Sequence, residues 1–137
     1  MIYRAMVGDD YEAAYQLWEN TDGMGLSEAD SRGNIIRYLE RNPGISQVCV
    51  REDGTLLGTA MCGHDGRRGY MYHVAVHSSS RGSGVGRELV ARCLAGLREA
   101  GITKCHLMVI GDNAPGRIFW TRIGWQERDG LVLFSKI

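Results

Sequence analysis

The chain has 137 residues, and its 16 basic and 16 acidic side chains give a formal net charge of zero. That length is sufficient for a domain whose core needs neither a disulfide nor a metal to fold. The balanced charge gives no electrostatic reason to expect nucleic acid or an anionic membrane as a partner. We therefore expect a single domain over residues 1–137 that binds neither.

The cysteine pattern and the N-terminus point to a reducing compartment. Cys49, Cys62, Cys93 and Cys105 form no C-x-x-C pair and lie in apolar segments, where free cysteine usually packs as a small hydrophobe. Met1 to Arg4 is not followed by an apolar signal region, and no apolar run approaches the roughly 20 residues that span a bilayer. These features favour the cytoplasm.

The first half of the chain alternates strand and helix patterns. Residues 2–6 are predicted to form a strand, and Asp9 or Asp10 can cap the helix that follows. Turn-forming residues at 20–25 end that helix. Ser27 opens a second helix, which Asn42-Pro43-Gly44 stops.

The second half adds five strands and two helices. The Asp53-Gly54 pair predicts a hairpin between the first two of these strands. A helix with an apolar stripe begins near Val85 and ends at Gly101, and a short one runs from Pro115 to Gly124. The predicted strands are residues 47–51, 56–62, 70–77, 104–110 and 131–137, the last of which closes the sheet.

A glycine-rich turn between the predicted strand at 70–77 and the next helix is the most informative motif. In Arg81-Gly82-Ser83-Gly84-Val85-Gly86, the glycines let the backbone turn sharply and approach a ligand, while the first amides of a helix can bind an anion. No Lys-Ser or Lys-Thr pair follows, so the turn is not a P-loop, and its spacing is not G-x-G-x-x-G. A different phosphate-binding turn is indicated.

This turn resembles the acetyl-CoA signature of the GNAT N-acetyltransferase superfamily, Arg/Gln-x-x-Gly-x-Gly/Ala. The resemblance covers nearly the whole chain, since Val76-His77 is similar to the end of the family's fourth strand and the stretch from Asn113 to Trp125 is similar to a family helix motif. Leu17-Trp18-Glu19, Asp22 and Tyr72 are similar to the pattern of small bacterial YpeA-type members.

The resemblance implies an α+β GNAT fold, with a mixed, mostly antiparallel sheet of about seven strands flanked by four helices. It implies acetyl-CoA as co-substrate and is compatible with a homodimer. Main-chain groups at the end of the fourth strand would pair with the pantetheine arm. The residues implied to bind the cofactor are Val74, Ala75, Val76, Arg81, Gly82, Ser83, Gly84, Val85, Gly86, Asn113 and Trp120.

The residues that the family uses for proton transfer are replaced in this chain. Trp120 stands where many members carry a tyrosine acid, and an indole N–H is not an acid near neutral pH; filling core space is an alternative role for it. Tyr70 and Met108 occupy the positions of the glutamate bases. Tyr72 and His73 are the catalytic candidates in their place, each with ordinary packing as the alternative, and strand alternation sends the two to opposite faces.

Acceptor recognition is expected in the loop between the first two helices. Asp22, Glu28 and Asp30 can hold a cationic amine, although acidic residues at helix starts also serve as caps. His64 and His106 have no metal-ligand spacing, so no metal is expected. The sequence therefore predicts an N-acetyltransferase that moves an acetyl group from acetyl-CoA to a primary amine in a ternary complex. The alternative is a catalytically weakened protein that binds or senses acyl-CoA.

Overall fold

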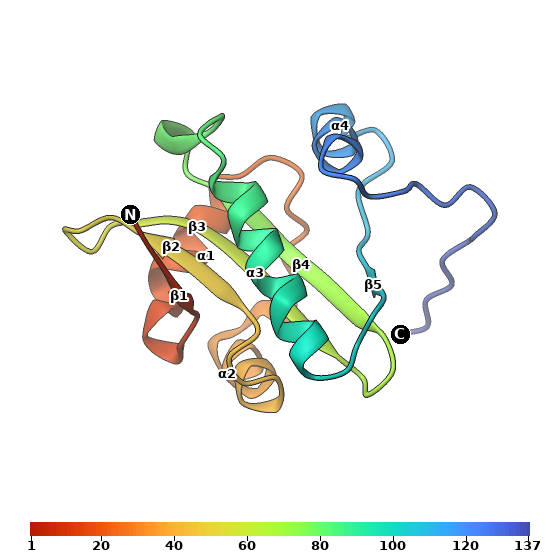
Figure 1. The fold of residues 1–137 in the computed structure, drawn as a ribbon, viewed down its shortest axis with the longest axis horizontal. Coiled ribbons are helices and arrows are strands. Elements are labelled where there is room, and N and C mark those ends of the chain that lie inside the picture. Colours follow the sequence, from red (N-terminus) through yellow and green to blue (C-terminus); the bar gives the residue numbers. More distant parts are fainter.

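A computed structural model describes all 137 residues, which build one five-stranded sheet in the order β1-β2-β3-β4-β5. The first four strands pair antiparallel with their neighbours, and β5 is parallel to β4. Figure 1 shows the helices arranged around this sheet. The strands are β1 (Ile2–Ala5), β2 (Gln47–Val50), β3 (Leu56–His64), β4 (Gly69–Val76) and β5 (Cys105–His106).

Four α-helices accompany the sheet, as the sequence predicted. They are α1 (Tyr11–Glu19), α2 (Arg32–Arg41), α3 (Val85–Glu99) and α4 (Ala114–Arg122). The predicted second helix begins as a separate 3-10 turn, Glu28–Asp30, and α2 itself starts after Ser31, whose side chain accepts a hydrogen bond from the Asn34 amide. Short 3-10 helices also precede α1 (Gly8–Asp10) and follow β4 (Ser78–Ser80).

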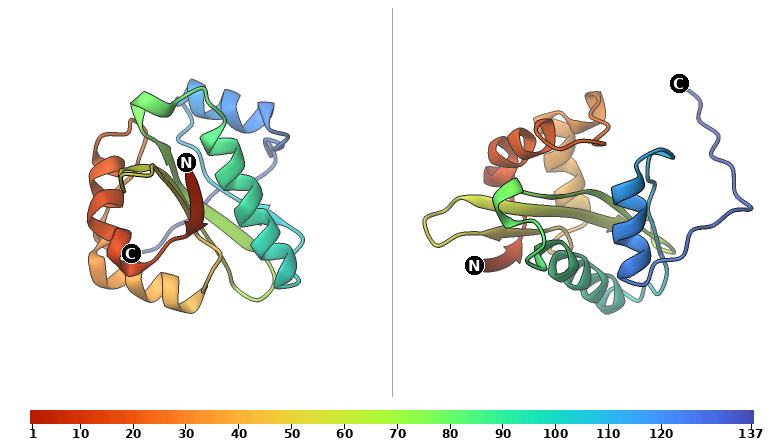
Figure 2. Two further views of the ribbon diagram at one scale, coloured as in Figure 1. Left: turned by 60° about the vertical axis from the view of Figure 1, so that its left-hand side comes forward. Right: turned by 90° about the horizontal axis from the view of Figure 1, so that it is seen from above.

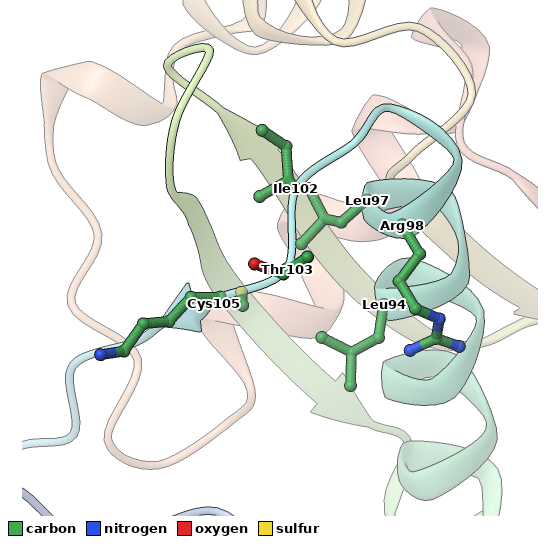
Figure 3. A pocket seen from close by; sticks show the side chains of 7 residues that line it. Leu94, Leu97, Arg98, Ile102, Thr103 and Cys105 are labelled. Atoms are coloured by element: carbon green, nitrogen blue, oxygen red, sulfur yellow. The ribbon is translucent and has the colours of Figure 1, made fainter.

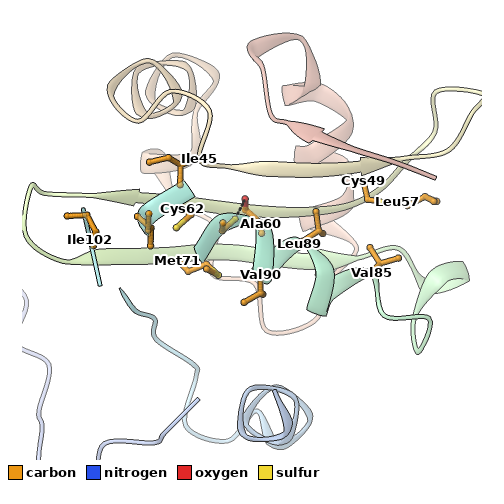
Figure 4. Packing of buried hydrophobic residues seen from close by; sticks show 12 residues of the cluster. Ile45, Cys49, Leu57, Ala60, Cys62, Met71, Val85, Leu89, Val90 and Ile102 are labelled. Carbon is orange, nitrogen blue, oxygen red and sulfur yellow. Dashed lines mark hydrogen bonds between the residues drawn. The ribbon is translucent and has the colours of Figure 1, made fainter. Parts of the chain in front are cut away.

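Two hydrophobic cores lie on the two faces of the sheet. One packs α3 against the sheet through residues such as Leu89 and Cys93, and Figure 4 shows this cluster from close by. The other packs α1 and α2 through Trp18 and Ile35. The central strand β3 is buried along almost its whole length because both of its faces are covered. Figure 2 shows the sheet between these helices.

The expected sheet of about seven strands is wrong, because only five strands form. The strand predicted at 104–110 is limited to Cys105–His106, which pair only with Gly69 and Tyr70. No strand therefore pairs with the rest of that edge of β4. The segment 131–137 is not a strand either: β5 is too short to offer a ladder that a further strand could join. Its apolar side chains are exposed, and Figures 1 and 2 show it running outside the sheet.

A β-bulge in β4 overturns the expectation that Tyr72 and His73 face opposite ways. Thr59 pairs with Ala75 and Met61 pairs with Tyr72, so two residues of β4 oppose one residue of β3. His73, within the bulge, is the only non-glycine residue with a positive φ, 49°. The extra residue cancels one alternation. Tyr72 therefore lies against Tyr38 of α2 while His73 lies against Trp18 of α1, both on the same face.

Candidate functional site

The glycine turn after β4 forms a groove at the start of α3. Its volume is about 320 Å³, and Arg81 and Arg87 bring positive charge to it. We call it the glycine-turn groove. It is lined by Val76, Ser80, Arg81, Gly82, Gly84, Val85, Gly86, Arg87 and Phe119.

The backbone of the turn leaves room and open amides for a ligand. Gly82 and Gly84 have φ of +78° and +87°, and a Cβ on either would meet nothing within 4 Å. Gly84 is the N-cap of α3 and no side chain caps the helix there. The first amides of α3 therefore have neither an intrahelical nor a capping partner, which makes them available to an anion.

Side chains around the turn fix its shape. The Arg81 Nε donates to the carbonyl oxygen of Val76 at 3.1 Å, which ties the turn to the end of β4. The Ser79 amide donates to Nδ1 of His77 at 3.1 Å. Ser83 does not line the groove, because its hydroxyl donates to the Ser80 carbonyl.

Three groove residues were not predicted from the sequence: Ser80, Arg87 and Phe119. Arg87 directly follows the motif, so its position next to the last glycine was a usable signal. Phe119 comes from α4, and its ring lies 3.2 Å from the position that a Cβ on Gly86 would take. Gly86 therefore serves the close packing of Phe119, a contact between segments that no local pattern reveals.

The predicted residues on α4 lie beside the groove but do not line it. Asn113 is the N-cap of α4, and its Oδ1 accepts from the Gly116 amide at 3.2 Å. Trp120 packs edge-to-face with Phe119 and Trp125, at ring distances of 5.0 and 4.9 Å, against the α3 core. The packing alternative for Trp120 thus has direct geometric support.

The residues Val74, Ala75 and Val76 form the end of β4 next to the groove. Val74 and Val76 pack against the α3 core, whereas Ala75 is buried on the α1 face. No strand pairs with these three residues on the β5 side. The sheet edge that leads into the glycine-turn groove is therefore open to an extended ligand.

On the other face, His73 and Asp30 form a close pair. Nε2 of His73 lies 2.6 Å from Oδ1 of Asp30, and their side chains are 12% and 9% exposed. The His73 ring also lies 4.6 Å from the ring of Trp18. Pairing of Asp30 with a residue 43 positions away was not predicted.

The three acidic residues predicted for acceptor binding have different environments. Asp22 and Glu28 are exposed in the α1–α2 connection, as an acceptor site requires. Asp30 is buried, and its Oδ2 accepts from the Ser27 amide at 3.0 Å, which is the capping alternative. Gly23 in the same connection lies against Asn113, so this loop meets the start of α4.

Tyr72 is 40% exposed. Burial raises its pKa, with smaller contributions from Tyr70 and Cys105. Its phenol therefore stays protonated near neutral pH, as a hydrogen-bond donor rather than a base.

A second, smaller hollow of about 100 Å³ lies between the C-terminal half of α3 and β5, and Figure 3 shows its lining. Leu94, Leu97 and Ile102 make it largely apolar. No group of three or more His, Cys, Asp or Glu side chains is placed to hold a metal ion. None of the helices is long and apolar enough to cross a membrane.

A parallel strand pair that ends early, an open strand edge and a glycine turn at a helix N-terminus match the expected fold of a GNAT acyltransferase. The model of the Acetyltransferase (GNAT) family matches residues 7–125, and the chain belongs to this family.

Relatives of the chain carry the same activity name. It is 37% identical over 129 residues to an acetyltransferase of Pectobacterium atrosepticum, covering 94% of this chain and 90% of the relative. It is 32% identical over 136 residues to an acetyltransferase of Sodalis glossinidius, covering 99% of this chain and 94% of the relative. The family match and these relatives together support acetyl transfer.

Among solved structures, an aminoglycoside antibiotic 6'-N-acetyltransferase from Acinetobacter haemolyticus has a TM-score of 0.79 at 17% identity, covering 100% of this chain and 99% of the other. A Mycobacterium tuberculosis protein solved with CoA has a TM-score of 0.73 at 19% identity, covering 98% of this chain and 77% of the other. At these identities the likeness shows the fold alone.

Proposed function

We propose that the protein is an acetyl-CoA-dependent N-acetyltransferase that passes the acetyl group directly to a primary amine in a ternary complex. The observation that carries this proposal is the glycine-turn groove, which continues the open edge of β4. We further propose that residues 1–137 act as one domain of the YpeA type. The residues that support this subgroup are Leu17-Trp18-Glu19, Asp22 and Tyr72.

The groove fits the pyrophosphate of CoA. Amides at the start of α3 and the guanidinium groups of Arg81 and Arg87 offer donors and positive charge to a diphosphate. Arg81 is the stronger candidate, since its Nε is fixed on Val76 and the rest of the guanidinium is left to bind. Ser83 then acts through the shape of the turn, by its bond to Ser80.

The open edge of β4 fits the pantetheine arm. An extended chain with amide groups can add to an unpaired strand edge through main-chain hydrogen bonds, and Val74, Ala75 and Val76 provide such an edge. Asn113 and Trp120 would act indirectly at this site. Asn113 caps the start of α4, and Trp120 packs behind Phe119.

The acceptor is proposed to approach from the α1 and α2 face, where Asp22 and Glu28 are exposed. Acidic side chains there would attract an ammonium group. Fold relatives that act on amines include the aminoglycoside enzyme above and a ribosomal-protein-S18-alanine N-acetyltransferase of Escherichia coli, with a TM-score of 0.74. These relatives support an amine as the class of acceptor.

On the same face, His73 is proposed to accept the proton of the acceptor and Tyr72 to donate a hydrogen bond. The raised pKa of Tyr72 suits a donor to the departing thiolate. Trp120 cannot protonate the departing thiolate, because an indole N–H does not ionise near neutral pH.

Replacing Gly84 tests the cofactor site. Gly84→Val places a branched side chain in the groove, and we expect acetyl-CoA affinity, measured by calorimetry, to fall more than about tenfold. Gly101→Val is the matched control: Gly101 has φ of +82° and equally open surroundings, but lies at the far end of α3. It carries the same backbone strain and should bind normally.

If folded Gly84→Val binds acetyl-CoA with wild-type affinity, the groove is not part of the cofactor site. Activity is tested by measuring thiol release from acetyl-CoA with a panel of primary amines. Binding without release for any amine would favour the acyl-CoA-sensing alternative.

A further inference from the structure

We infer that Asp30 is a positioning residue that holds His73 in the tautomer whose Nδ1 takes the proton from the acceptor ammonium. This inference rests on the proposed acetyl transfer, and it changes the role of Asp30 from contact with substrate to support of the base.

The tautomer follows from the hydrogen-bonding capacity of the two groups. A carboxylate only accepts hydrogen bonds, and Oδ1 of Asp30 lies 2.6 Å from Nε2 of His73. Nε2 must therefore carry a proton to make this bond. In the neutral ring the lone pair is then on Nδ1, which is the atom that can act as a base.

Nδ1 is free and reachable. It forms no hydrogen bond in the protein, and the only buried side-chain nitrogen or oxygen without a partner is the hydroxyl of Tyr38. Since Nδ1 has no partner and is not among the buried atoms, solvent reaches it. A water molecule there could bridge Nδ1 to the ammonium group of the acceptor.

Both the ring and the backbone of His73 are held in place. Trp18 is fully buried and packs against the ring, while its Nε1 donates to Oγ1 of Thr59 at 2.9 Å. That hydroxyl donates in turn to the carbonyl oxygen of His73 at 2.7 Å. The ring is therefore fixed against Trp18, and the bulged backbone through Thr59.

Asp30 is itself fixed by two elements. The Ser27 amide donates to its Oδ2 at 3.0 Å, and the Tyr11 hydroxyl donates to its carbonyl oxygen at 2.7 Å. No lysine or arginine side chain bonds to Asp30 or His73, so the carboxylate of Asp30 has no competing cation. Burial, followed by Tyr15 and Asp30, raises the pKa of Tyr11, which leaves its phenol neutral. A positioned carboxylate that stabilises the imidazolium is thus present without competition.

The backbone of His73 also points to function. A positive φ in a non-glycine residue costs free energy and persists where the surroundings enforce it, often at active sites. The bulge turns the ring to the face where the acceptor is proposed to enter. Val76, at the mouth of the groove, is three residues away, or about 10 Å along the strand.

The proton balance of the reaction is complete with this pair. Nδ1 of His73 takes one proton from the ammonium, and the neutral amine attacks the acetyl carbonyl. The C–S bond then breaks, the new amide nitrogen loses its second proton to the thiolate, and the imidazolium returns its proton to water. The products are the amide, free CoA and one released proton.

The tautomer is tested directly by nitrogen NMR of the free protein, which needs no acceptor. We expect a protonated Nε2 and an unprotonated Nδ1 near neutral pH. In Asp30→Asn the amide can donate to Nε2, so an Nδ1–H population should appear. Asp9→Asn, at an exposed carboxylate in the 3-10 turn before α1, is the matched control and should leave the spectrum unchanged. A wild-type spectrum with Nδ1 protonated overturns the inference, whether or not Asp30→Asn folds.

The catalytic role is tested by the pH profile of kcat/KM with any amine that the panel identifies. His73→Asn suits the left-handed backbone and should lower the rate roughly 100-fold, removing the limb that reports the base. Asp30→Asn should lower it at least about tenfold, while Asp9→Asn does not.

Unchanged rate and profile in His73→Asn would reject the base and leave the cofactor site standing. If the wild-type protein does not bind acetyl-CoA, or releases no thiol with any amine, the proposed transferase is rejected instead. The two failures are therefore distinguishable.

Discussion

Asp10 and Asp30 make the same local hydrogen bond to the backbone but have different side-chain partners. Each closes a 3-10 turn by accepting from the amide three residues earlier, Val7 for Asp10 and Ser27 for Asp30. The remaining bonds of Asp10 come from Arg4, at 2.8 and 2.9 Å. Arginine stays charged at every accessible pH, so that pair is structural. Asp30 pairs instead with the imidazole of His73, whose Nδ1 has no hydrogen-bond partner in the protein.

Asp10 should make stability depend on pH in the acid range. Burial alone would raise its pKa, but hydrogen bonds from Arg4 and the Val7 amide, together with the charge of Arg4, hold the pKa below its usual value of 3.8. A lowered folded-state pKa means that the stabilisation is fully present above about pH 4 to 5 and is lost as the pH falls through the folded value. Asp10→Asn should therefore reduce the slope of unfolding free energy against pH below pH 4.

The measurement is thermal unfolding between pH 2 and pH 7, with Asp9→Asn as control, because Asp9 is exposed and makes no side-chain hydrogen bond. At pH 7 Asp10→Asn should cost about 1–2 kcal/mol. If Asp10→Asn and the wild-type protein have the same slope, the pKa of Asp10 does not change on folding and the prediction is wrong.

The sequence predicted the glycine turn, but it did not predict the contact between His73 and Asp30. Arg81 to Gly86 act locally, so their order alone indicates a turn at a helix start. His73 and Asp30 were each named as candidates, but their contact joins segments 43 residues apart. Only the folded chain shows that one supports the other.

Glycines in the sheet decide how closely the helices approach it. A Cβ on Gly69 would lie 2.6 Å from a terminal carbon of Leu97 on α3. On the opposite face, a Cβ on Gly63 would lie 2.5 Å from Asn42, the C-cap of α2, and 2.7 Å from the hydroxyl of Tyr38 in α2. Leu97 can shift its flexible end, whereas Asn42 is 4% exposed and accepts from the His64 amide at 3.0 Å. The α2 side therefore tolerates less.

Gly63→Ala should consequently destabilise the protein by about 2–3 kcal/mol, since the new methyl group displaces Asn42 and frees the His64 amide. Denaturant unfolding gives the value. Gly33→Ala is the matched control in α2, where a Cβ meets nothing within 4 Å, and it should gain about 0.5 kcal/mol in a helix. Equal effects of the two changes would mean that α2 moves freely over β3.

Helices and turns that depend only on local sequence were predicted correctly. Strand features that depend on pairing with another strand were not. The hairpin at Asp53-Gly54 and the helix ended by Gly101 follow from local rules, and both form. The bulge at His73 does not follow, because the alternation rule assumes a regular ladder. The short β5 fails for a related reason: an apolar β-prone stretch becomes a strand only where a neighbour pairs with it along its length.

The sheet separates the face proposed to bind the cofactor from the face proposed to bind the acceptor. The glycine-turn groove belongs with α3 and its core, and the His73–Asp30 pair with α1 and its core. The bulge in β4 is the point at which the two meet, since Val74 packs on one core and Ala75 on the other. This arrangement is compatible with the proposed ternary complex, in which acetyl-CoA and the amine would bind on opposite sides of β4.

The segment 131–137 lies outside both faces and should contribute little to stability. Leu131, Val132, Leu133 and Phe134 are 68%, 80%, 71% and 90% exposed, so they bury almost no apolar surface. A protein ending at Gly130 should keep its unfolding temperature within about 2 °C and, having lost an exposed β-prone apolar stretch, should scatter less light at high concentration.

Paired substitutions separate this expectation from a general tolerance to change. Val132→Asp should leave the unfolding temperature unchanged, whereas Val90→Asp, at a position 3% exposed in the α3 core, should lower it steeply or prevent folding. If truncation lowered the unfolding temperature by about 5 °C or more, the segment would have to bury apolar surface in solution. Size-exclusion chromatography would then show whether that surface belongs to the same chain or to a second copy, because only the second copy would give a dimer that truncation converts to monomer.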